Sequence, residues 1–526
     1  MTEPIADHNL YTALRAGCPA ALEAIAIETA DTPAALYYTW RDLDRASARL
    51  ANLLDSLALP PASRIALHVD KSVEALLLYL AVLRAGHVCL PLNPAYQAAE
   101  LEYFIADAEP ALLVCSPRSQ PWLAPLAARL GTPHLLTLGA DRSGSLLERA
   151  AAMGDHHRPV PRAADDLAAI IYTSGTTGRS KGAMLSHGNL LANARVLHAA
   201  WGWAEHARGA DRSDGGDVLI HALPIFHVHG LFVACHGALL AGSRMLWFSK
   251  FDAAAVLARL PAATVLMGVP TMYVRLLAEP GLDRAACGRI RLFVSGSAPL
   301  LAETFAEWER RSGQRILERY GMSETVMLTS NPYRPPSARR PGTVGWPLPG
   351  TELRVCDEQG RQLPAGEIGG VEVRGPSVFK GYWRRPDKTA EDHTADGWFR
   401  TGDVGRIAAD GCLSLVGRSK DLIISGGYNV YPAEVEGYLD ALPGVAESAV
   451  VGVPHADYGE AVIALVVPRP GARPDPQALI AALKARIAGF KLPKRLLVVD
   501  ELPRNAMGKV QKNLLREQHR GLLVGG

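Results

Sequence analysis

Short apolar runs alternate with amphipathic stretches through the first third of the chain. The apolar runs predict buried strands at 65–69, 87–92 and 111–115. The stretches between them carry apolar residues at helical spacing and predict helices at 73–83 and 98–106. Because strands that alternate with helices form parallel sheets covered on both faces, this pattern predicts an α/β fold.

The helix before this region begins with a recognisable cap, and the alternation returns further along the chain. Thr39-Trp40-Arg41-Asp42 fits a capping box and is followed by apolar residues at helical spacing. Further strands are predicted at 218–223, 244–247, 264–267 and 291–294. After Pro341, short strands alternate with Gly/Pro turns and predict a small β-rich subdomain.

The C-terminal part of the chain has a pattern of its own. A helix is predicted to begin at Pro432, and further elements are expected at 448–453, 461–467, 477–487 and 495–499. We therefore expect a large N-terminal domain over 1–417, with two αβ-layered sheets and the β-rich subdomain, and a small α/β domain over 421–526.

Composition supports a globular protein of two or more domains. The chain has 526 residues, which exceeds what one hydrophobic core normally serves, and 48% of them are hydrophobic. Its net charge of +2 gives no reason to expect a nucleic-acid or membrane partner. The seven scattered cysteines include no C-x-x-C pair and favour reduced thiols. With no basic and apolar leader visible, we expect a cytoplasmic protein.

One loop carries most of the chemical information. Residues 172–182 read Tyr-Thr-Ser-Gly-Thr-Thr-Gly-Arg-Ser-Lys-Gly and follow the apolar run 167–171. Glycine backbone N–H groups, hydroxyls and cations together can wrap a polyphosphate. The Walker A pattern does not fit, because Ser180 stands where its second glycine should be and Lys181 is followed by Gly182.

The loop resembles the phosphate-binding signature of the adenylate-forming superfamily, which includes acyl-CoA synthetases, peptide-synthetase adenylation domains and firefly-type luciferases. Ser180 stands where the family usually has Pro. Four further segments resemble family motifs in the family's order: 295–300, 320–325, 397–403 and 503–509. The resemblance implies a ligase that uses ATP, Mg²⁺ and coenzyme A (CoA).

The resemblance also implies roles for individual residues in binding ATP. Tyr320 would stack on adenine, Asp403 would accept hydrogen bonds from the ribose, and Glu324 would bind Mg²⁺ together with Thr176. The full set expected around ATP is Thr173, Ser174, Gly175, Thr176, Thr177, Gly178, Lys181, Ser297, Ala298, Pro299, Arg319, Tyr320, Gly321, Met322, Ser323, Thr325, Asp403 and Arg418.

The C-terminal domain is expected to move. Lys509, in a segment that resembles the family's P-R-x-x-x-G-K, would neutralise charge at the α-phosphate during adenylation. By the same resemblance, 418–420 is the hinge, centred on Lys420. Rotation would withdraw Lys509 and present a CoA-binding loop formed by Ser425, Gly426, Gly427 and Tyr428.

Two segments bear on the acid substrate. In F-H-V-H-G-L, from Phe226, we expect His227 to be catalytic and to contact the substrate carboxylate; a zinc site is disfavoured because no Cys or carboxylate completes a ligand set. In G-V-P-T-M-Y-V-R, from Gly268, Arg275 shares a helix face with Thr271 and Met272. Together the segments resemble the malonyl-CoA synthetase branch, with Arg275 as the anchor of a buried distal carboxylate.

Alternatives remain at this level. Medium-chain or aryl acyl-CoA synthetases share the motifs, as do stand-alone adenylation enzymes that load a carrier protein. The chain ends seventeen residues after Lys509, so any carrier would be a separate protein. A non-catalytic nucleotide sensor is a more distant alternative. Malonate is the expected substrate, methylmalonate is a second candidate, and the oligomeric state is left open.

Overall fold

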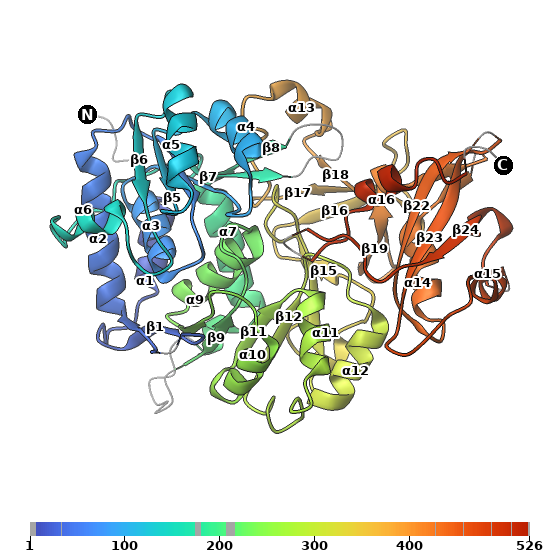
Figure 1. The fold of residues 1–526 in the computed structure, drawn as a ribbon. Coiled ribbons are helices and arrows are strands. Elements are labelled where there is room, and N and C mark those ends of the chain that lie inside the picture. The colour runs from blue at the N-terminus through green and yellow to red at the C-terminus, as the bar shows by residue number, and fades with distance from the viewer. Residues whose placement is uncertain are drawn as a thin grey trace.

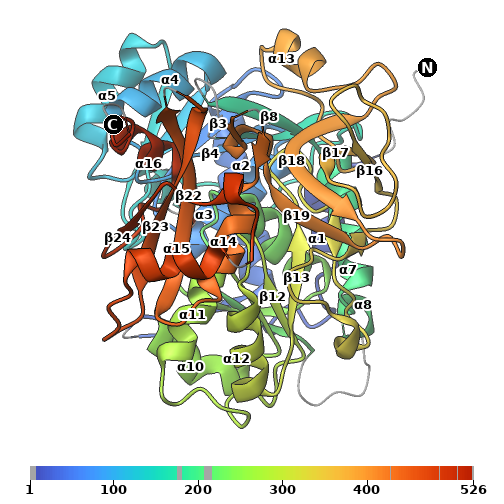
Figure 2. The same cartoon turned by 90° about the vertical axis from the view of Figure 1, so that its right-hand side faces the viewer.

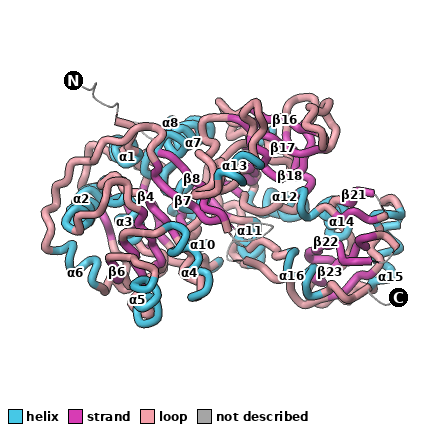
Figure 3. Tube along the Cα trace, turned by 90° about the horizontal axis from the view of Figure 1, so that it is seen from above, coloured by secondary structure: helices cyan, strands magenta, loops and turns pink. Residues whose placement is uncertain are grey.

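The computed structural model describes residues 7–32, 34–173, 180–206, 216–426, 428–455, 457–484, 486–505 and 508–523. A large N-terminal part, blue to yellow in Figure 1, is followed by a smaller orange and red part that lies against one side of it. The view from above shows the same division (Figure 3). Among the described residues, no helix is both long and apolar enough to cross a bilayer.

The first sheet has six strands in the order β6-β5-β3-β4-β7-β8. Its strands are β3 (Arg64–His68), β4 (Val88–Pro91), β5 (Leu112–Cys115), β6 (His134–Thr137), β7 (Leu167–Thr173) and β8 (Lys181–Ser186). Pairing is parallel except between β7 and β8, which form an antiparallel hairpin. The predicted parallel α/β sheet is therefore confirmed here.

The second sheet has nine strands in the order β15-β14-β13-β12-β11-β9-β10-β1-β2. They are β1 (Ile25–Thr29), β2 (Tyr37–Thr39), β9 (Val218–His221), β10 (Arg244–Trp247), β11 (Val265–Gly268), β12 (Leu292–Ser295), β13 (Ile316–Tyr320), β14 (Thr329–Ser330) and β15 (Trp346–Pro347). The centre is parallel, and β2, β14 and β15 are antiparallel additions at its ends.

Helices cover both sheets. Every residue of α3 (Val73–Arg84) is buried, which is expected for a helix that is apolar on nearly all sides and has charged residues only near its ends. The predicted capping box opens α2 (Trp40–Ser56): the Asp42 amide donates to the Thr39 hydroxyl over 3.1 Å. The other N-terminal helices are α1 (Leu10–Ala16), α4 (Ala98–Ala108), α5 (Gln120–Arg129), α6 (Ser145–Ala151), α7 (His187–Ala200), α8 (Trp203–His206), α9 (His236–Leu240), α10 (Ala253–Arg259), α11 (Pro270–Ala278), α12 (Ala302–Ser312) and α13 (Pro386–Glu391).

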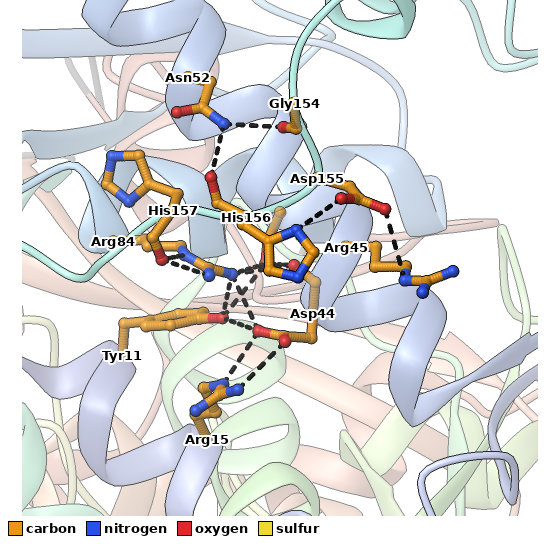
Figure 4. A network of polar contacts seen from close by, with 11 residues as sticks. Tyr11, Arg15, Asp44, Arg45, Asn52, Arg84, Gly154, Asp155, His156 and His157 are labelled. Carbon is orange, nitrogen blue, oxygen red and sulfur yellow. Dashed lines mark hydrogen bonds and ion pairs between the residues drawn. The ribbon is translucent and has the colours of Figure 1, made fainter.

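A buried guanidinium holds several of these helices together (Figure 4). Arg84 of α3 donates to the Tyr11 hydroxyl over 2.6 Å, to the Asp44 carboxylate over 3.0 Å and to the His157 carbonyl. Arg15 of α1 adds a bidentate contact to Asp44. The charge of Arg84 is therefore satisfied by the protein itself.

The β-rich subdomain and the C-terminal domain follow. The subdomain is an antiparallel sheet of β16 (Glu352–Cys356), β17 (Gly369–Arg374), β18 (Phe399–Ile407) and β19 (Leu413–Arg418). The C-terminal sheet contains β20 (Ile423–Ser425), β21 (Tyr428–Val430), β22 (Val445–His455), β23 (Gly459–Pro468) and β24 (Arg495–Val498). Its helices are α14 (Pro432–Asp440), α15 (Pro476–Lys484) and α16 (Lys512–Gln518).

The chain passes from one domain to the other through a very short connection. β19 ends at Arg418 in one sheet and β20 begins at Ile423 in another, with a single 3-10 turn over Ser419–Asp421 between them. In Figure 2 the C-terminal domain lies in front of β12, β13 and β19. Arg469 of this domain forms an ion pair with Glu303 of α12. The region between the two domains is therefore the place to look for a site.

Candidate functional site

Two motif segments meet at one edge of the nine-stranded sheet. β12 and β13 pair in parallel, with Ser295 opposite Glu318, so both strands end at the same edge. Ser297 follows the end of β12, and Tyr320 is the last residue of β13. Ligands of α/β proteins usually bind at the carboxyl ends of parallel strands.

Three residues expected to bind the nucleotide form one cluster, in which Tyr320 and Asp403 are buried and Arg418 is half-buried. The Tyr320 hydroxyl donates to Asp403, and Arg418 Nε lies 2.8 Å from the other oxygen of that carboxylate. Asp403 and Arg418 face each other across β18 and β19, so strand register fixes the pair. Burial, followed by the Asp403 charge, raises the pKa of Tyr320, and the tyrosine therefore stays a neutral donor.

A second cluster surrounds Glu324. This buried carboxylate accepts a hydrogen bond from the Tyr382 hydroxyl over 3.1 Å. The ammonium of Lys181 lies 4.2 Å from the centre of the Tyr382 ring and 3.4 Å from Asp392. Burial raises the pKa of Glu324, which means that a nearby cation would stabilise its ionised form.

The structure describes some of the remaining residues of the 320–325 motif and of the glycine–hydroxyl loop. Thr325 is fully buried and accepts a hydrogen bond from the Met322 amide over 3.4 Å. In the glycine–hydroxyl loop, Thr173 pairs with Lys181 across β7 and β8. Ser174, Gly175, Thr176, Thr177 and Gly178 lie outside the described residues.

Lys509 belongs to the C-terminal domain and reaches the nucleotide residues. Burial between the domains and the charge of Arg418 lower its pKa to about 8, and Asp403 opposes this shift. Lys509 is exposed to solvent in this arrangement, and its ammonium lies within range of the charges of Asp403 and Arg418. The structure therefore brings Lys509 near Arg418 and Asp403, which stand 91 and 106 positions earlier in the sequence.

The histidines of the F-H-V-H-G segment lie near Arg319 and Ser297. Burial, then the charges of Arg319 and Lys509, lower the pKa of His227 to about 4, so the ring is neutral at physiological pH. The pKa of His229 is lowered for the same main reason, and its Nδ1 lies 3.4 Å from the Ser297 hydroxyl. Ser297 itself has a φ of +71°, an uncommon conformation for a residue with a side chain.

The other two histidines of this region have partners within the fold. His221 Nε2 lies 2.9 Å from the Gly230 carbonyl oxygen, and the ring stacks on Trp247. His236 Nε2 lies 2.7 Å from the Tyr79 hydroxyl. Among the described residues, no group of three or more His, Cys, Asp and Glu side chains is arranged to hold a metal ion.

Arg319 is the most unusual residue of the site. Its side chain is buried, and its Nε and Nη2 have no hydrogen-bond partner among the described residues. Burial lowers its pKa to about 9. A Cβ atom at Gly296 would overlap the guanidinium, so this glycine makes the room that Arg319 occupies.

Comparison with other buried arginines shows how unusual this is. In the described part of the chain, Arg84, Arg319 and Arg339 are the arginines with less than a tenth of their surface exposed. Arg84 is satisfied by the network of Figure 4, and Arg339 donates to carbonyl groups including that of Tyr333 over 2.9 Å. A buried guanidinium without such partners costs several kcal/mol, so pairing with an anion would stabilise the charge of Arg319.

Arg275 was expected to be buried, and this was wrong. It is exposed on α11, because the cavity that it lines is open to solvent. This cavity of about 1450 Å³ lies between the domains, and Thr271 and Met272 line it as well, so the predicted common helix face is confirmed. Its walls are largely apolar and include Val69, Leu92, Ile225 and Phe226.

The described residues of the expected CoA loop contact their own domain. Tyr428 is 59% exposed and stacks on Phe490 at 4.7 Å between ring centres. Ser425 is buried, and the Gly426 amide donates to the Tyr458 carbonyl over 2.9 Å; Gly427 is outside the described residues. Lys420 lies in the connection, where its carbonyl accepts from Arg516 over 3.0 Å.

The sequence analysis did not single out two residues that take part in the site. Tyr382 holds Glu324, and no sequence signal marks it. Lys71 lines the cavity and donates to the His221 carbonyl over 2.9 Å, and burial lowers its pKa to about 7. A lysine two residues after the predicted strand 65–69 was the available signal.

Comparison with known proteins was consistent with this geometry. The family model described as AMP-binding enzyme matches residues 22–383, and the model described as AMP-binding enzyme C-terminal domain matches residues 434–509.

Individual relatives cover almost the whole chain. A feruloyl-CoA synthase from Amycolatopsis is 37% identical over 91% of this chain and 94% of its own. A malonate–CoA ligase from Arabidopsis thaliana is 35% identical over 86% of this chain and 78% of its own. The crystal structure of ATP-bound MatB from Rhodopseudomonas palustris is 50% identical, with a TM-score of 0.93 over 98% of this chain and all of that one.

Proposed function

The chain belongs to the AMP-binding enzyme family, and from this premise we propose that it is an ATP-dependent, AMP-forming ligase that joins malonate to CoA. The observation that carries the choice of malonate is the buried guanidinium of Arg319, whose Nε and Nη2 have no partner among the described residues. A dicarboxylate offers one carboxylate for reaction and a second one for this arginine.

The distal carboxylate is held by positive charge and by neutral donors. Arg319 supplies Nε and Nη2, and a guanidinium pairs with a carboxylate in bidentate fashion. The neutral ring of His229 leaves its buried Nε2 for a further contact. Arg275, on the wall of the open cavity, adds a second cation that solvent screens.

The relatives include an aryl-acid ligase, and Arg319 argues against an aryl acid here. An aromatic acyl group would bury the guanidinium of Arg319 further without pairing it. Acetate would likewise leave it unpaired. Methylmalonate keeps the second carboxylate and adds one methyl group, and it is the most plausible additional substrate.

In the first half-reaction, an oxygen of the proximal carboxylate attacks the α-phosphorus of ATP. The Pα–O–Pβ bond breaks and pyrophosphate leaves. Lys509 and Arg418 bring positive charge to the growing negative charge on the phosphate oxygens, and Asp403 accepts hydrogen bonds from the ribose. His227 is neutral, so it can donate to the reacting carboxylate without protonating it.

Glu324 fits the Mg²⁺ that this chemistry uses. It is a buried oxygen ligand whose pKa is raised by burial, so a divalent cation would compensate its charge. Thr176 is proposed as a second ligand from the sequence motif. When bound, the ion would offset charge on the phosphates that leave as pyrophosphate.

The second half-reaction forms the thioester. The CoA thiol attacks the acyl carbonyl, AMP departs with the electrons of the broken C–O bond, and the thiol proton passes to solvent. We propose that the domain of residues 421–526 first rotates about Lys420, which exchanges Lys509 for the loop of Ser425, Gly426, Gly427 and Tyr428.

The test is a substrate panel measured by CoA-dependent AMP release. Malonate should give the highest kcat/KM, followed by methylmalonate, with acetate, butyrate and ferulate far lower. A clear preference for ferulate or butyrate over malonate would contradict the assignment. Release of pyrophosphate without thioester formation from CoA would favour a carrier-protein acceptor instead.

A further inference from the structure

Lys509 lies on a short hairpin whose shape is held by two neighbouring side chains. Arg504 and Val510 form an isolated antiparallel bridge, and the Asn505 amide donates to the Lys509 carbonyl over 2.9 Å. The Asn505 side-chain oxygen in turn accepts from the Lys509 amide over 3.0 Å. The backbone of the catalytic lysine is therefore fixed from both directions.

Arg504 connects this hairpin to the rest of its domain. Its Nη1 donates to the Gly508 carbonyl, directly before Lys509, over 2.5 Å. Its Nη2 forms an ion pair with Glu447 on β22. One planar guanidinium thus links a rigid strand to the residue that precedes the catalytic lysine, which the single point charge of a lysine side chain could not do equally well.

The hairpin also approaches the other domain, at Thr271 of α11. Gly508 has a φ of +73°, and a Cβ atom there would lie 2.9 Å from the Thr271 hydroxyl of α11. Arg504, Asn505, Gly508 and Thr271 all line the cavity between the domains. A shift of the hairpin would therefore move Lys509 relative to Asp403 and Arg418.

We propose that Arg504, held by Glu447, is a positioning residue for Lys509 and serves the adenylation half-reaction selectively. The proposal rests on the proposed function in that it assumes two half-reactions at one site. Thioester formation does not use Lys509 in this scheme, so loss of the clamp leaves it intact. Misplacement of a reacting group by about 1 Å can cost about a hundredfold in rate.

The experiment measures the two half-reactions separately in Arg504→Ala, Arg504→Lys, Glu447→Gln and the double variant Arg504→Ala/Glu447→Gln. Acid-dependent pyrophosphate exchange reports adenylation, and transfer to CoA from synthetic malonyl-adenylate reports thioester formation. Arg495→Ala, an exposed arginine on β24 of the same domain, is the matched control.

We expect exchange to fall about 10- to 100-fold in Arg504→Ala, while thioester formation stays within about threefold of wild type. Arg504→Lys should recover only part of the exchange. Glu447→Gln should lower exchange as well. The double variant should exchange pyrophosphate no more slowly than Arg504→Ala, because both substitutions remove the same Arg504–Glu447 contact. Arg495→Ala should behave as wild type.

Wild-type exchange in Arg504→Ala, or a parallel loss of both half-reactions, would overturn the proposal. Its failure can be told apart from failure of the proposed function. If wild type does not use malonate, the function is wrong, and the ratio of exchange to thioester formation is then measured with the acid that wild type does use and that acid's adenylate.

Discussion

Replacement of Arg319 by Met should separate substrate recognition from stability. The change removes a buried charge that has no partner at Nε and Nη2 among the described residues, and it keeps a side chain of similar length. Because the folded protein bears the desolvation cost of this charge, the ligand-free variant should be more stable than wild type. Exchange of buried charge for apolar volume typically adds about 1–4 kcal/mol to the free energy of unfolding.

The same change should remove most of the activity on malonate. A carboxylate left in a buried pocket without its cation costs about 3–5 kcal/mol. At about 1.4 kcal/mol for each tenfold change, kcat/KM for malonate should fall by about two to three and a half powers of ten. Isovalerate, which replaces the distal carboxylate by a branched apolar group of similar shape, should become the better substrate.

The assay is AMP release with CoA for malonate and isovalerate, combined with thermal unfolding of the ligand-free proteins. Arg319→Lys is the charge-retaining control and should keep part of the malonate activity. If Arg319→Met uses malonate within threefold of wild type, the anchor is elsewhere. If its unfolding temperature falls and both acids lose activity equally, Arg319 has a structural role instead.

Three further predictions follow from the site and from the C-terminal domain. Arg275→Ala should lower kcat/KM for malonate about tenfold or less, because its exposed charge is screened; a larger loss than in Arg319→Met would reverse the two roles. The rate of adenylation, measured by pyrophosphate exchange, should decline above pH 8, since the pKa of Lys509 is lowered to about 8 and only its ammonium form neutralises charge; a rate that is flat to pH 10 would argue against this role. Asp440, whose pKa is raised to about 7 by burial and by Glu436 and Glu447, holds its proton more tightly in the folded state, so stability is lost as pH rises from about 4 to 7. At pH 8, the free energy of unfolding of Asp440→Asn should therefore exceed that of wild type by roughly 2 kcal/mol after solvent screening, which raises the unfolding temperature; at pH 4 the two proteins should unfold at the same temperature. Equal unfolding temperatures at pH 8 would contradict the shift.

The regular elements could be predicted because their residues repeat with a clear period. The capping box at Thr39, the parallel strands and the helix that carries Thr271, Met272 and Arg275 were all found where they were expected, with strand and helix ends moved by a few residues. β14 and β15 were not predicted, since strands of two residues contain no period. The hairpin of β22 and β23 is longer than predicted, because pairing continues through polar residues at both ends.

The site was harder to predict where function depends on burial. Sequence spacing correctly placed Arg275 on one helix face with Thr271 and Met272, but it does not show that the cavity is open to solvent. Arg319 stands inside a motif that resembles an ATP-binding segment, and it was therefore assigned to ATP. Its unpaired state depends on the β12–β13 pairing and on the space left by Gly296, which are properties of the assembled sheet.

The most direct test of the account is a crystal structure with a non-hydrolysable malonyl-adenylate analogue. We predict that the ribose hydroxyls contact Asp403 and that the distal carboxylate pairs with the Arg319 guanidinium. An analogue whose distal carboxylate points into solvent, with Arg319 still unpaired, would contradict the central claim that this arginine selects a dicarboxylic acid.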